Sequence, residues 1–327
     1  MSAAGAGTTG ATPHPSTVAV TTASAAAFAV GALVALQARF NGDLARDLGG
    51  GFTGGAVAAL LNFVVGFAVL SVWVGAAPAQ RRALAGLPGQ ARSGRLLWWQ
   101  YLGGLGGTFL ILSQSISVPT VGVAVFTVAV VGGQTVSGLV VDRYGLGPAG
   151  RQPVTSARVA AALIAVGAVV LAVSGRLGSA SFSLGLILLC AAAGCAVSVQ
   201  SALNGQVGRA AGSPIVAAWL NFAIGVVVLL VVVGAALGAG QRVQSPPANW
   251  WLFTGGLFGV AFVSVVVAAV RTVGVLVVTL ATVAGQVCGA VLLDAFAPVA
   301  GQELQLVTVL GAAATVGAVL LAVRSAQ

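Results

Sequence analysis

The chain has 327 residues, of which 58% are hydrophobic and only 6% are charged. Because a soluble domain carries about a quarter charged residues, this composition excludes a soluble globular protein and predicts an integral membrane protein. The net charge of +9 comes from 14 basic residues, all Arg. They stand singly or in pairs between apolar runs, which is typical of a topology signal and excludes nucleic acid as a partner.

The predicted elements are membrane-spanning helices, each of which needs about 20 mainly apolar residues. Residues 1–17 form a polar tail without the basic region of a signal peptide, so the first apolar run is interpreted as a retained helix. Ten runs qualify in chain order: Val18–Phe40, Gly54–Ala76, Leu96–Val118, Val121–Val141, Val154–Ser174, Phe182–Leu203, Pro214–Leu237, Trp250–Val270, Val273–Phe296 and Leu304–Val323. We therefore expect an all-α membrane protein with ten transmembrane helices and short connections, the longest being a link over Pro78–Arg95.

The distribution of Arg predicts the orientation, because short cytoplasmic loops carry an excess of basic residues. With ten helices, both termini share one side of the membrane. That side holds Arg81, Arg82, Arg92, Arg95, Arg143, Arg151, Arg158, Arg209, Arg271 and Arg324, and the opposite side holds Arg39, Arg46, Arg176 and Arg242. Since the Arg-only, Ala/Val/Gly-rich composition is typical of a GC-rich bacterial genome, we expect a multi-pass protein of the cell (inner) membrane with both termini cytoplasmic.

An internal repeat relates the two halves of the chain. Gln37-x-x-x-Asn41-Gly42 recurs as Gln200-x-x-x-Asn204-Gly205, each at the end of an apolar run. Further equivalent residues follow in the same order: Leu61-Asn62-Phe63-x-x-Gly66 with Leu220-Asn221-Phe222-x-x-Gly225, Trp98-Trp99 with Trp250-Trp251, Gly103 and Gly107 with Gly255 and Gly259, Gln134 with Gln286, and Asp142 with Asp294. Each half has five predicted helices, an odd number, so the second must lie upside down relative to the first. We expect two inverted five-helix repeats over residues 18–176 and 177–327, an arrangement common among transporters.

Amide side chains within the helices are the first candidates for a substrate site. A polar group in hydrocarbon is costly unless it finds a partner or lines a wet cavity. Gln134 and Gln286 lie in the middle of equivalent helices, where they could bind a polar, uncharged part of a substrate or join helices by hydrogen bonds. The candidate substrate-binding residues are Gln37, Asn41, Gln134, Gln200, Asn204 and Gln286.

Other repeated residues have structural interpretations. Asn-Gly after an apolar run is typical of a helix C-terminus with a left-handed Gly, which would end two helices at Asn41-Gly42 and Asn204-Gly205. Asn62 and Asn221 are expected to join neighbouring helices. The repeated Gly pairs, four residues apart, predict close helix–helix contact.

Asp142 and Asp294 are two of only five acidic residues, and each closes a predicted helix. A carboxylate at a helix C-terminus opposes the helix dipole, so neither is expected to stabilise its own helix. Both are candidate residues for coupling to a proton. The alternative for Asp142 is an ion pair with Arg143 at the membrane interface, and the alternative for Asp294 is a plain interfacial position.

Several classes of chemistry lack the residues that they need. Without Lys there is no Walker A loop, and the only His, His14, lies in the tail. Cys190, Cys195 and Cys288 lie in apolar runs and are expected to be reduced thiols. We therefore predict that the protein is not an enzyme and has no cofactor and no metal.

The repeated Gln-x-x-x-Asn-Gly and Leu-Asn-Phe-x-x-Gly motifs on five plus five short helices resemble the drug/metabolite transporter superfamily. Within it, the chain is similar to the YdcZ-type inner-membrane exporters over everything after the tail. This resemblance implies a central cavity bordered by the third, fourth, eighth and ninth helices, with Gln134 and Gln286 in it, and export coupled to a proton or to exchange. The small multidrug members carry an essential Glu in the first helix, where this chain has Gln37, which weighs against a multidrug-cation substrate.

The expected function is secondary transport, as an exporter of a small polar or amphipathic metabolite or drug, by alternating access of two inverted halves. A passive facilitator or channel, and a non-transporting membrane receptor or assembly protein, stay open as alternatives. The expected partners are a small-molecule substrate, the lipid bilayer, a coupling proton and, in a homodimer, a second copy of the chain.

Overall fold

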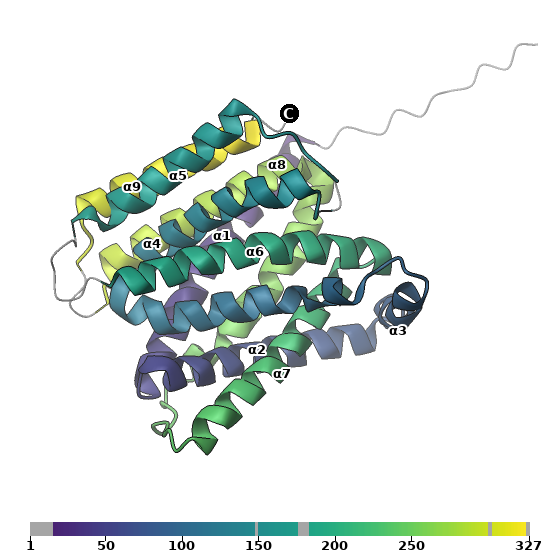
Figure 1. Cartoon of the computed structure of the whole chain (residues 1–327), viewed down its shortest axis with the longest axis horizontal. Coiled ribbons are helices and arrows are strands. Elements are labelled where there is room, and N and C mark those ends of the chain that lie inside the picture. The colour runs from purple at the N-terminus through teal and green to yellow at the C-terminus, as the bar shows by residue number, and fades with distance from the viewer. Residues whose placement is uncertain (1–15, 148–149, 176–182, 300–302, 325–327) are drawn as a thin grey trace, which may run out of the picture.

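The computed structural model describes residues 16–147, 150–175, 183–299 and 303–324 (Figure 1). These residues contain α-helices and short 3-10 helices (η), with no strand among them. The elements are α1 (Thr17–Asp47), α2 (Gly51–Ala76), α3 (Pro78–Arg92), η1 (Trp98–Gly103), α4 (Gly104–Tyr144), α5 (Ser156–Ser174), α6 (Leu184–Ala211), α7 (Pro214–Gly238), η2 (Trp250–Thr254), α8 (Gly255–Phe296) and α9 (Leu306–Arg324). The predicted all-α class is confirmed; residues 1–15 of the predicted tail lie outside the described residues.

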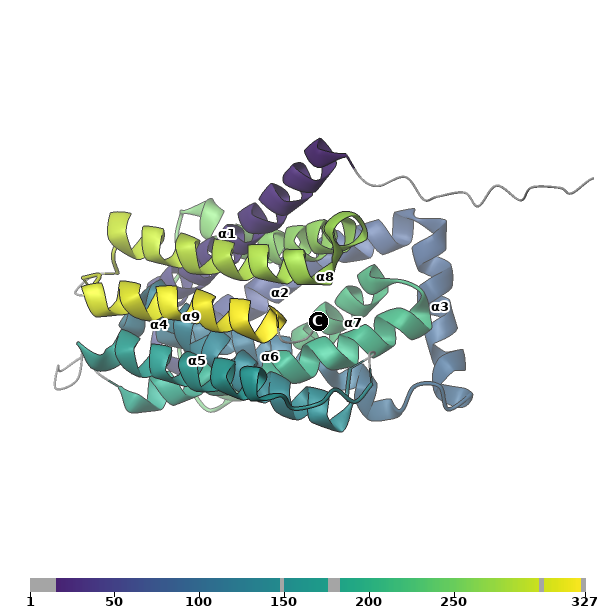
Figure 2. The ribbon, with the colours of Figure 1, turned by 90° about the horizontal axis from the view of Figure 1, so that it is seen from above.

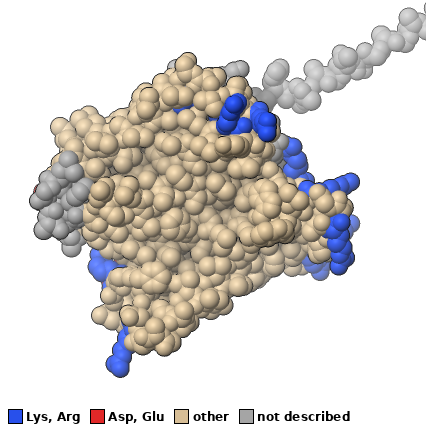
Figure 3. Space-filling view, viewed as in Figure 1, with Lys and Arg blue, Asp and Glu red and all other residues tan. Residues whose placement is uncertain are grey.

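The described helices have the length and surface of membrane-spanning segments. Eight stretches are long and apolar enough to cross a membrane, and Leu306–Ala322 is apolar but shorter. Large apolar side chains face outward, among them Leu163 and Val231, which are about two-thirds exposed. Figure 3 shows a broad face without charge, with Arg confined to its margins. Such a surface suits lipid rather than water.

The longest helices, α4 and α8, are each interrupted by one glycine. Gly122 has φ 78° and ψ 167°, and Gly274 has φ 80° and ψ 164°, a backbone conformation that favours Gly. Gln206 of α6 hydrogen-bonds both Gln100 in η1 and the Leu146 carbonyl just after α4, so it brings the two ends of α4 together. α4 is therefore a helical hairpin that turns at Gly122 and contains the third and fourth predicted segments, as α8 contains the eighth and ninth.

Most of the predicted link over Pro78–Arg95 forms a helix, α3, that the sequence pattern does not predict. Pro78 occupies the first turn, where a missing N–H costs nothing, and most of the following residues are good helix formers. Leu87 is buried, and its carbonyl accepts a hydrogen bond of 2.8 Å from the Tyr101 hydroxyl. α3 lies across one end of the bundle (Figure 2).

The predicted helix ends at Asn41-Gly42 and Asn204-Gly205 are wrong. α1 continues to Asp47 and α6 to Ala211, and neither Gly42 nor Gly205 has a positive φ. A Cβ on Gly42 would lie 2.8 Å from Val118 Cγ1. Close packing, rather than a left-handed turn, therefore explains this glycine.

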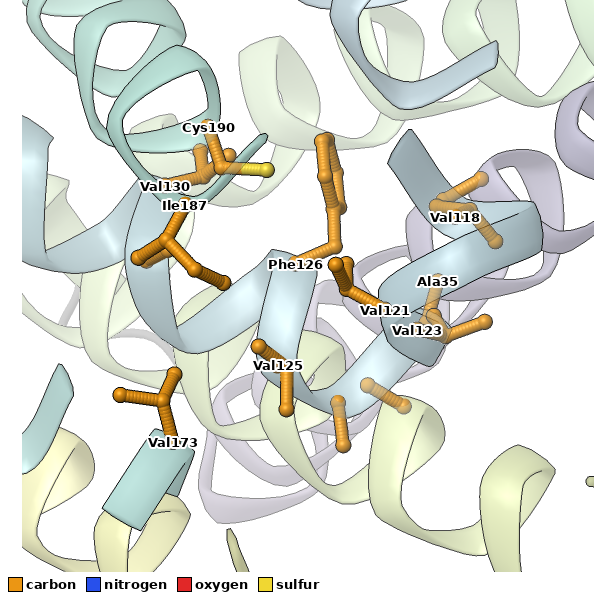
Figure 4. Packing of buried hydrophobic residues seen from close by; sticks show 14 residues of the cluster. Ala35, Val118, Val121, Val123, Val125, Phe126, Val130, Val173, Ile187 and Cys190 are labelled. Carbon is orange, nitrogen blue, oxygen red and sulfur yellow. The ribbon is translucent and has the colours of Figure 1, made fainter. Parts of the chain in front are cut away.

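The closest helix pairs join the two halves of the chain: α1 with α8, α4 with α6, α5 with α9, and α2 with α7. Glycines allow the approach. A Cβ on Gly31 would lie 2.1 Å from the Thr282 carbonyl oxygen, and one on Gly194 would lie 2.0 Å from that of Val130. The main apolar cluster also draws on both halves, with Phe126 packed near Cys190 (Figure 4). The halves therefore share one core instead of packing as separate domains.

Candidate functional site: a central cavity lined with amides

A cavity of about 430 Å³ lies between α1, α2, α4, α6, α7 and α8. Aromatic and aliphatic side chains form most of its wall, with Phe63, Phe222 and Phe262 among them. Its polar lining consists mainly of seven amide side chains: Gln37, Asn62, Gln134, Gln200, Asn204, Asn221 and Gln286. None of the described lining residues is ionisable.

Five of the six predicted substrate-binding residues line this one cavity, although they come from four helices. The sixth, Asn41, lies behind the lining and is 1% exposed. Asn62 Nδ2 donates a hydrogen bond of 3.0 Å to Asn41 Oδ1, and Gln37 Nε2 donates one of 3.4 Å to Asn62 Oδ1. Asn62 thus connects the lining to the buried amide. Contact between these six residues and a substrate stays a prediction.

Sequence reasoning missed the second asparagine pair as lining residues. Asn62 and Asn221 are predicted only to join helices, yet both line the cavity, and Phe63 and Phe222 lie beside them with ring centroids 5.2 Å apart. The signal is present in the Leu-Asn-Phe-x-x-Gly repeat, which carries both the amide and the ring. A motif interpreted as helix packing therefore also supplies the cavity wall.

The repeated glycines make room for the amides. A Cβ on Gly103 would lie 2.7 Å from Asn204 Oδ1, and one on Gly107 would lie 2.8 Å from Gln200 Nε2. In the other half, a Cβ on Gly255 would lie 2.6 Å from Asn62 Nδ2. The predicted close contact is therefore present, but the neighbours of these glycines are polar side chains of the site.

The two aspartates lie outside the lining. Asp142 pairs with Arg158 instead of the adjacent Arg143. Asp294 is 4% exposed and accepts hydrogen bonds from the backbone N–H groups of Val123, at 3.1 Å, and Ala124, at 2.7 Å. These are the first residues after the break in α4, so the carboxylate sits at a helix N-terminus, where the helix dipole favours negative charge. Coupling to a proton stays a prediction for both residues.

The lining of the cavity is suited to hydrogen bonding with a small molecule. An amide both donates and accepts hydrogen bonds, so the amides can bind polar, uncharged groups, while the phenylalanines suit a flat apolar part. The volume is in the range of small-molecule sites. Among the described residues there is no group of three or more His, Cys, Asp or Glu that could hold a metal ion.

A helical membrane protein with a polar-lined cavity between its helices has the architecture of a membrane transporter. The sequence matches the family described as "Putative inner membrane exporter, YdcZ" over residues 22–171 and 185–321, and the chain belongs to this family. The predicted family is thus confirmed, and the protein is a multi-pass membrane protein of a family described as inner-membrane exporters. No curated protein matches the chain.

Proposed function

We propose that the protein is a secondary exporter of a small, uncharged polar or amphipathic metabolite or drug. The observation that carries the proposal is the set of repeat-equivalent amides, Gln37 with Gln200 and Gln134 with Gln286, lining one cavity without a described ionisable group. Desolvating a charge in such a cavity would be costly. A neutral substrate can exchange its hydrogen bonds to water for hydrogen bonds to the amides.

Alternating access of two inverted five-helix halves is the proposed mechanism, and equivalent contacts support it. The approach of Gly31 to Thr282 recurs as that of Gly194 to Val130, and the equivalent residues Phe63 and Phe222 contact each other. A two-fold axis that exchanges the halves accounts for both relations. It would pass between the two rings.

The directions of the two hairpins support the inversion. The turn of α4 lies near the end of α1, since Gly42 packs against Val118, whereas both ends of α4 meet Gln206 at the end of α6. Both ends of α8 lie near the end of α1, because a Cβ on Gly255 would lie 2.9 Å from Asn41 Oδ1 and Asp294 binds Val123, beside the turn of α4. With each hairpin counted as two segments, the chain crosses the membrane ten times, and the Arg distribution favours cytoplasmic termini.

The test compares metabolites in the medium of cells that express the wild-type chain, Gln134→Ala/Gln286→Ala, or the control Gln241→Ala/Gln244→Ala, at matched membrane levels. The control removes two exposed amides outside the cavity. Mass spectrometry should find a metabolite enriched outside by the wild type and the control but not by the cavity variant. Equal enrichment by all three would reject these glutamines as the site.

Two further outcomes would separate the alternatives. Metabolite uptake into vesicles is measured under several imposed ion gradients. If the inside concentration never exceeds the outside concentration, the protein is a passive facilitator or channel. No movement of any metabolite in either direction favours a non-transporting receptor or assembly protein.

A further inference from the structure

The cavity extends to the junction of α6 and α7 but not to the equivalent junction of α1 and α2. Ser201, Gly205 and Pro214 line it where α6 ends and α7 begins; we call these residues the α6–α7 mouth. Their repeat equivalents, Ala38, Gly42 and Gly55, are not among the lining residues; we call them the α1–α2 mouth.

The α1–α2 mouth is closed by direct packing. Ala38 is 2% exposed. A Cβ on Gly42 would lie 2.8 Å from Val118 Cγ1, and one on Gly55 would lie 2.7 Å from Ile116 Cγ1. The first arm of α4, just before its turn, therefore packs against this mouth.

The two hairpin turns also differ in burial: the turn beside the closed mouth is buried and the other is exposed. Gly122, at the turn beside the closed mouth, is buried, and the next N–H groups are bound by Asp294. Gly274, at the equivalent turn of α8, is exposed, and a Cβ there would meet nothing within 4 Å. Asp142, the equivalent of Asp294, pairs with Arg158.

We infer that Asp294 is a latch that holds the α1–α2 mouth closed, and that Asp142 is the equivalent latch for the α6–α7 mouth. In the opposite state, Asp142 leaves Arg158 and accepts hydrogen bonds from the N–H groups after Gly274, while Asp294 releases Val123 and Ala124. The inference rests on the proposed alternating access and adds the positioning residues that exchange its two states.

Carboxylate-to-amide bonds suit this task. Hydrogen bonds to an ionised group are about twice as strong as neutral ones, and each latch would bind the N-terminal end of a helical arm, where the helix dipole adds to the attraction. Exchanging one latch for its equivalent replaces carboxylate-to-amide bonds by bonds of the same kind, but it also breaks the Asp142–Arg158 ion pair, which favours the state seen in this structure. The two states then differ mainly by this one ion pair, a gap that a reversible two-state switch allows.

The test measures cysteine accessibility and needs no substrate. In a chain whose Cys190, Cys195 and Cys288 are replaced by Ala, one reporter cysteine is introduced, either Ser201→Cys at the lined mouth or its equivalent Ala38→Cys at the closed mouth. The rate of reaction with a membrane-impermeant maleimide is measured in vesicles of each orientation. We expect the reporter at 201 to react from one side and the reporter at 38 to be protected.

Asp294→Asn should change the two reporters in opposite directions. The loss of one charged hydrogen bond shifts a two-state equilibrium roughly tenfold, so the reporter at 38 should react about tenfold faster, from the opposite side, and the reporter at 201 more slowly. Asp142→Asn should leave position 38 protected. The double variant should bring the ratio of the two rates back toward that of the parent chain.

A second variant keeps the Asp294 carboxylate but moves it away from the N–H groups of Val123 and Ala124. A Cβ on Gly122 would lie 2.9 Å from Asp294 Oδ2, so Gly122→Ala should give the same reciprocal shift. Gly274→Ala has a similar positive φ but no neighbour within 4 Å, so it introduces comparable backbone strain; because it would hinder only the Asp142 latch of the opposite state, it should leave position 38 protected.

Faster reaction at both positions would identify Asp294 as a merely structural residue, and unchanged rates at both would equally overturn the latch. Export in the metabolite test with no reciprocal shift would reject the latch and leave the proposed function intact. A reciprocal shift without export would support the latch and reject the proposed function.

Discussion

At the scale of single residues, one buried amide organises its neighbours. Asn62 accepts a hydrogen bond from Gln37 and donates one to Asn41, while it also lines the cavity. A hydrogen bond between helices in a membrane contributes about 0.6 kcal/mol on average. The position of Gln37 in the cavity wall therefore depends on Asn62.

Asn62→Ala should lower the free energy of unfolding by roughly 1 kcal/mol, because it removes two such bonds, and should weaken transport by freeing the Gln37 side chain. Titration with denaturing detergent measures the first effect. Gln241→Ala, which removes an exposed amide, is the control, and equal stability of the two variants would show that the Asn62 bonds contribute nothing.

Gly255→Ala should destabilise the protein by about 1–3 kcal/mol, the usual effect of overpacking. The added Cβ would lie 2.6 Å from Asn62 Nδ2, and the amide can move away only by straining its bonds. Gly234→Ala in α7, where a Cβ meets nothing within 4 Å, should be neutral or slightly stabilising because Ala favours helices. The ranking is checked by melting temperature in detergent, and a reversed ranking would contradict it.

At the scale of elements, the approach of helix backbones decides which helices can pair. At the α4–α6 crossing, Gly194 faces the Val130 carbonyl and Gly133 faces the Ala191 carbonyl, and a Cβ on either glycine would lie 2.0 Å from the oxygen that it faces. A backbone carbonyl cannot move aside as a side chain does. These crossings therefore accept no residue larger than glycine.

Gly194→Ala should accordingly be more damaging than Gly255→Ala, with less folded protein in the membrane and a lower melting temperature. Gly167→Ala in α5 is the matched control, since a Cβ there meets nothing within 4 Å. Fluorescence-detected size-exclusion chromatography after heating would show the order, and tolerance of Gly194→Ala equal to that of Gly167→Ala would count against a rigid crossing.

Local sequence patterns predict where the long helices lie, but they do not predict where these helices end or which residues pack against them. Apolar length and the repeat predict all the long segments, and amides at equivalent positions predict five of the cavity residues. α3 escapes prediction although most of its residues favour a helix, because Pro88 interrupts the pattern and the burial of Leu87 against α6 and α7 becomes visible only after folding. The extension of α1 past Asn41 escapes it because the partner that explains Gly42, Val118, becomes visible only after folding.

At the scale of the whole molecule, the closest helix–helix packing lies between the two halves and not within either half. α1 packs on α8 and α6 packs on α4. The hairpin of each half is therefore covered by a helix of the other half. A half alone would expose the glycine faces of these helices without a partner.

We therefore expect residues 1–178 and 179–327, expressed separately, to be degraded, and expressed together to copurify as a folded complex. The cut falls between α5 and α6. Membrane levels and copurification through a tag on one half provide the measurement, with the intact chain as the reference. Stable accumulation of either half alone would mean that the halves are independent domains.

The contact of Phe63 with its own equivalent, Phe222, has an evolutionary consequence. In an ancestral pair of identical five-helix subunits, this position would have met its own copy, so any substitution there would have altered both sides at once. In a single chain each side can change alone, and the two mouths differ already, with Pro214 in one where Gly55 stands in the other. Substitutions can thus adjust the two equivalent sites independently, which a pair of identical subunits would not allow.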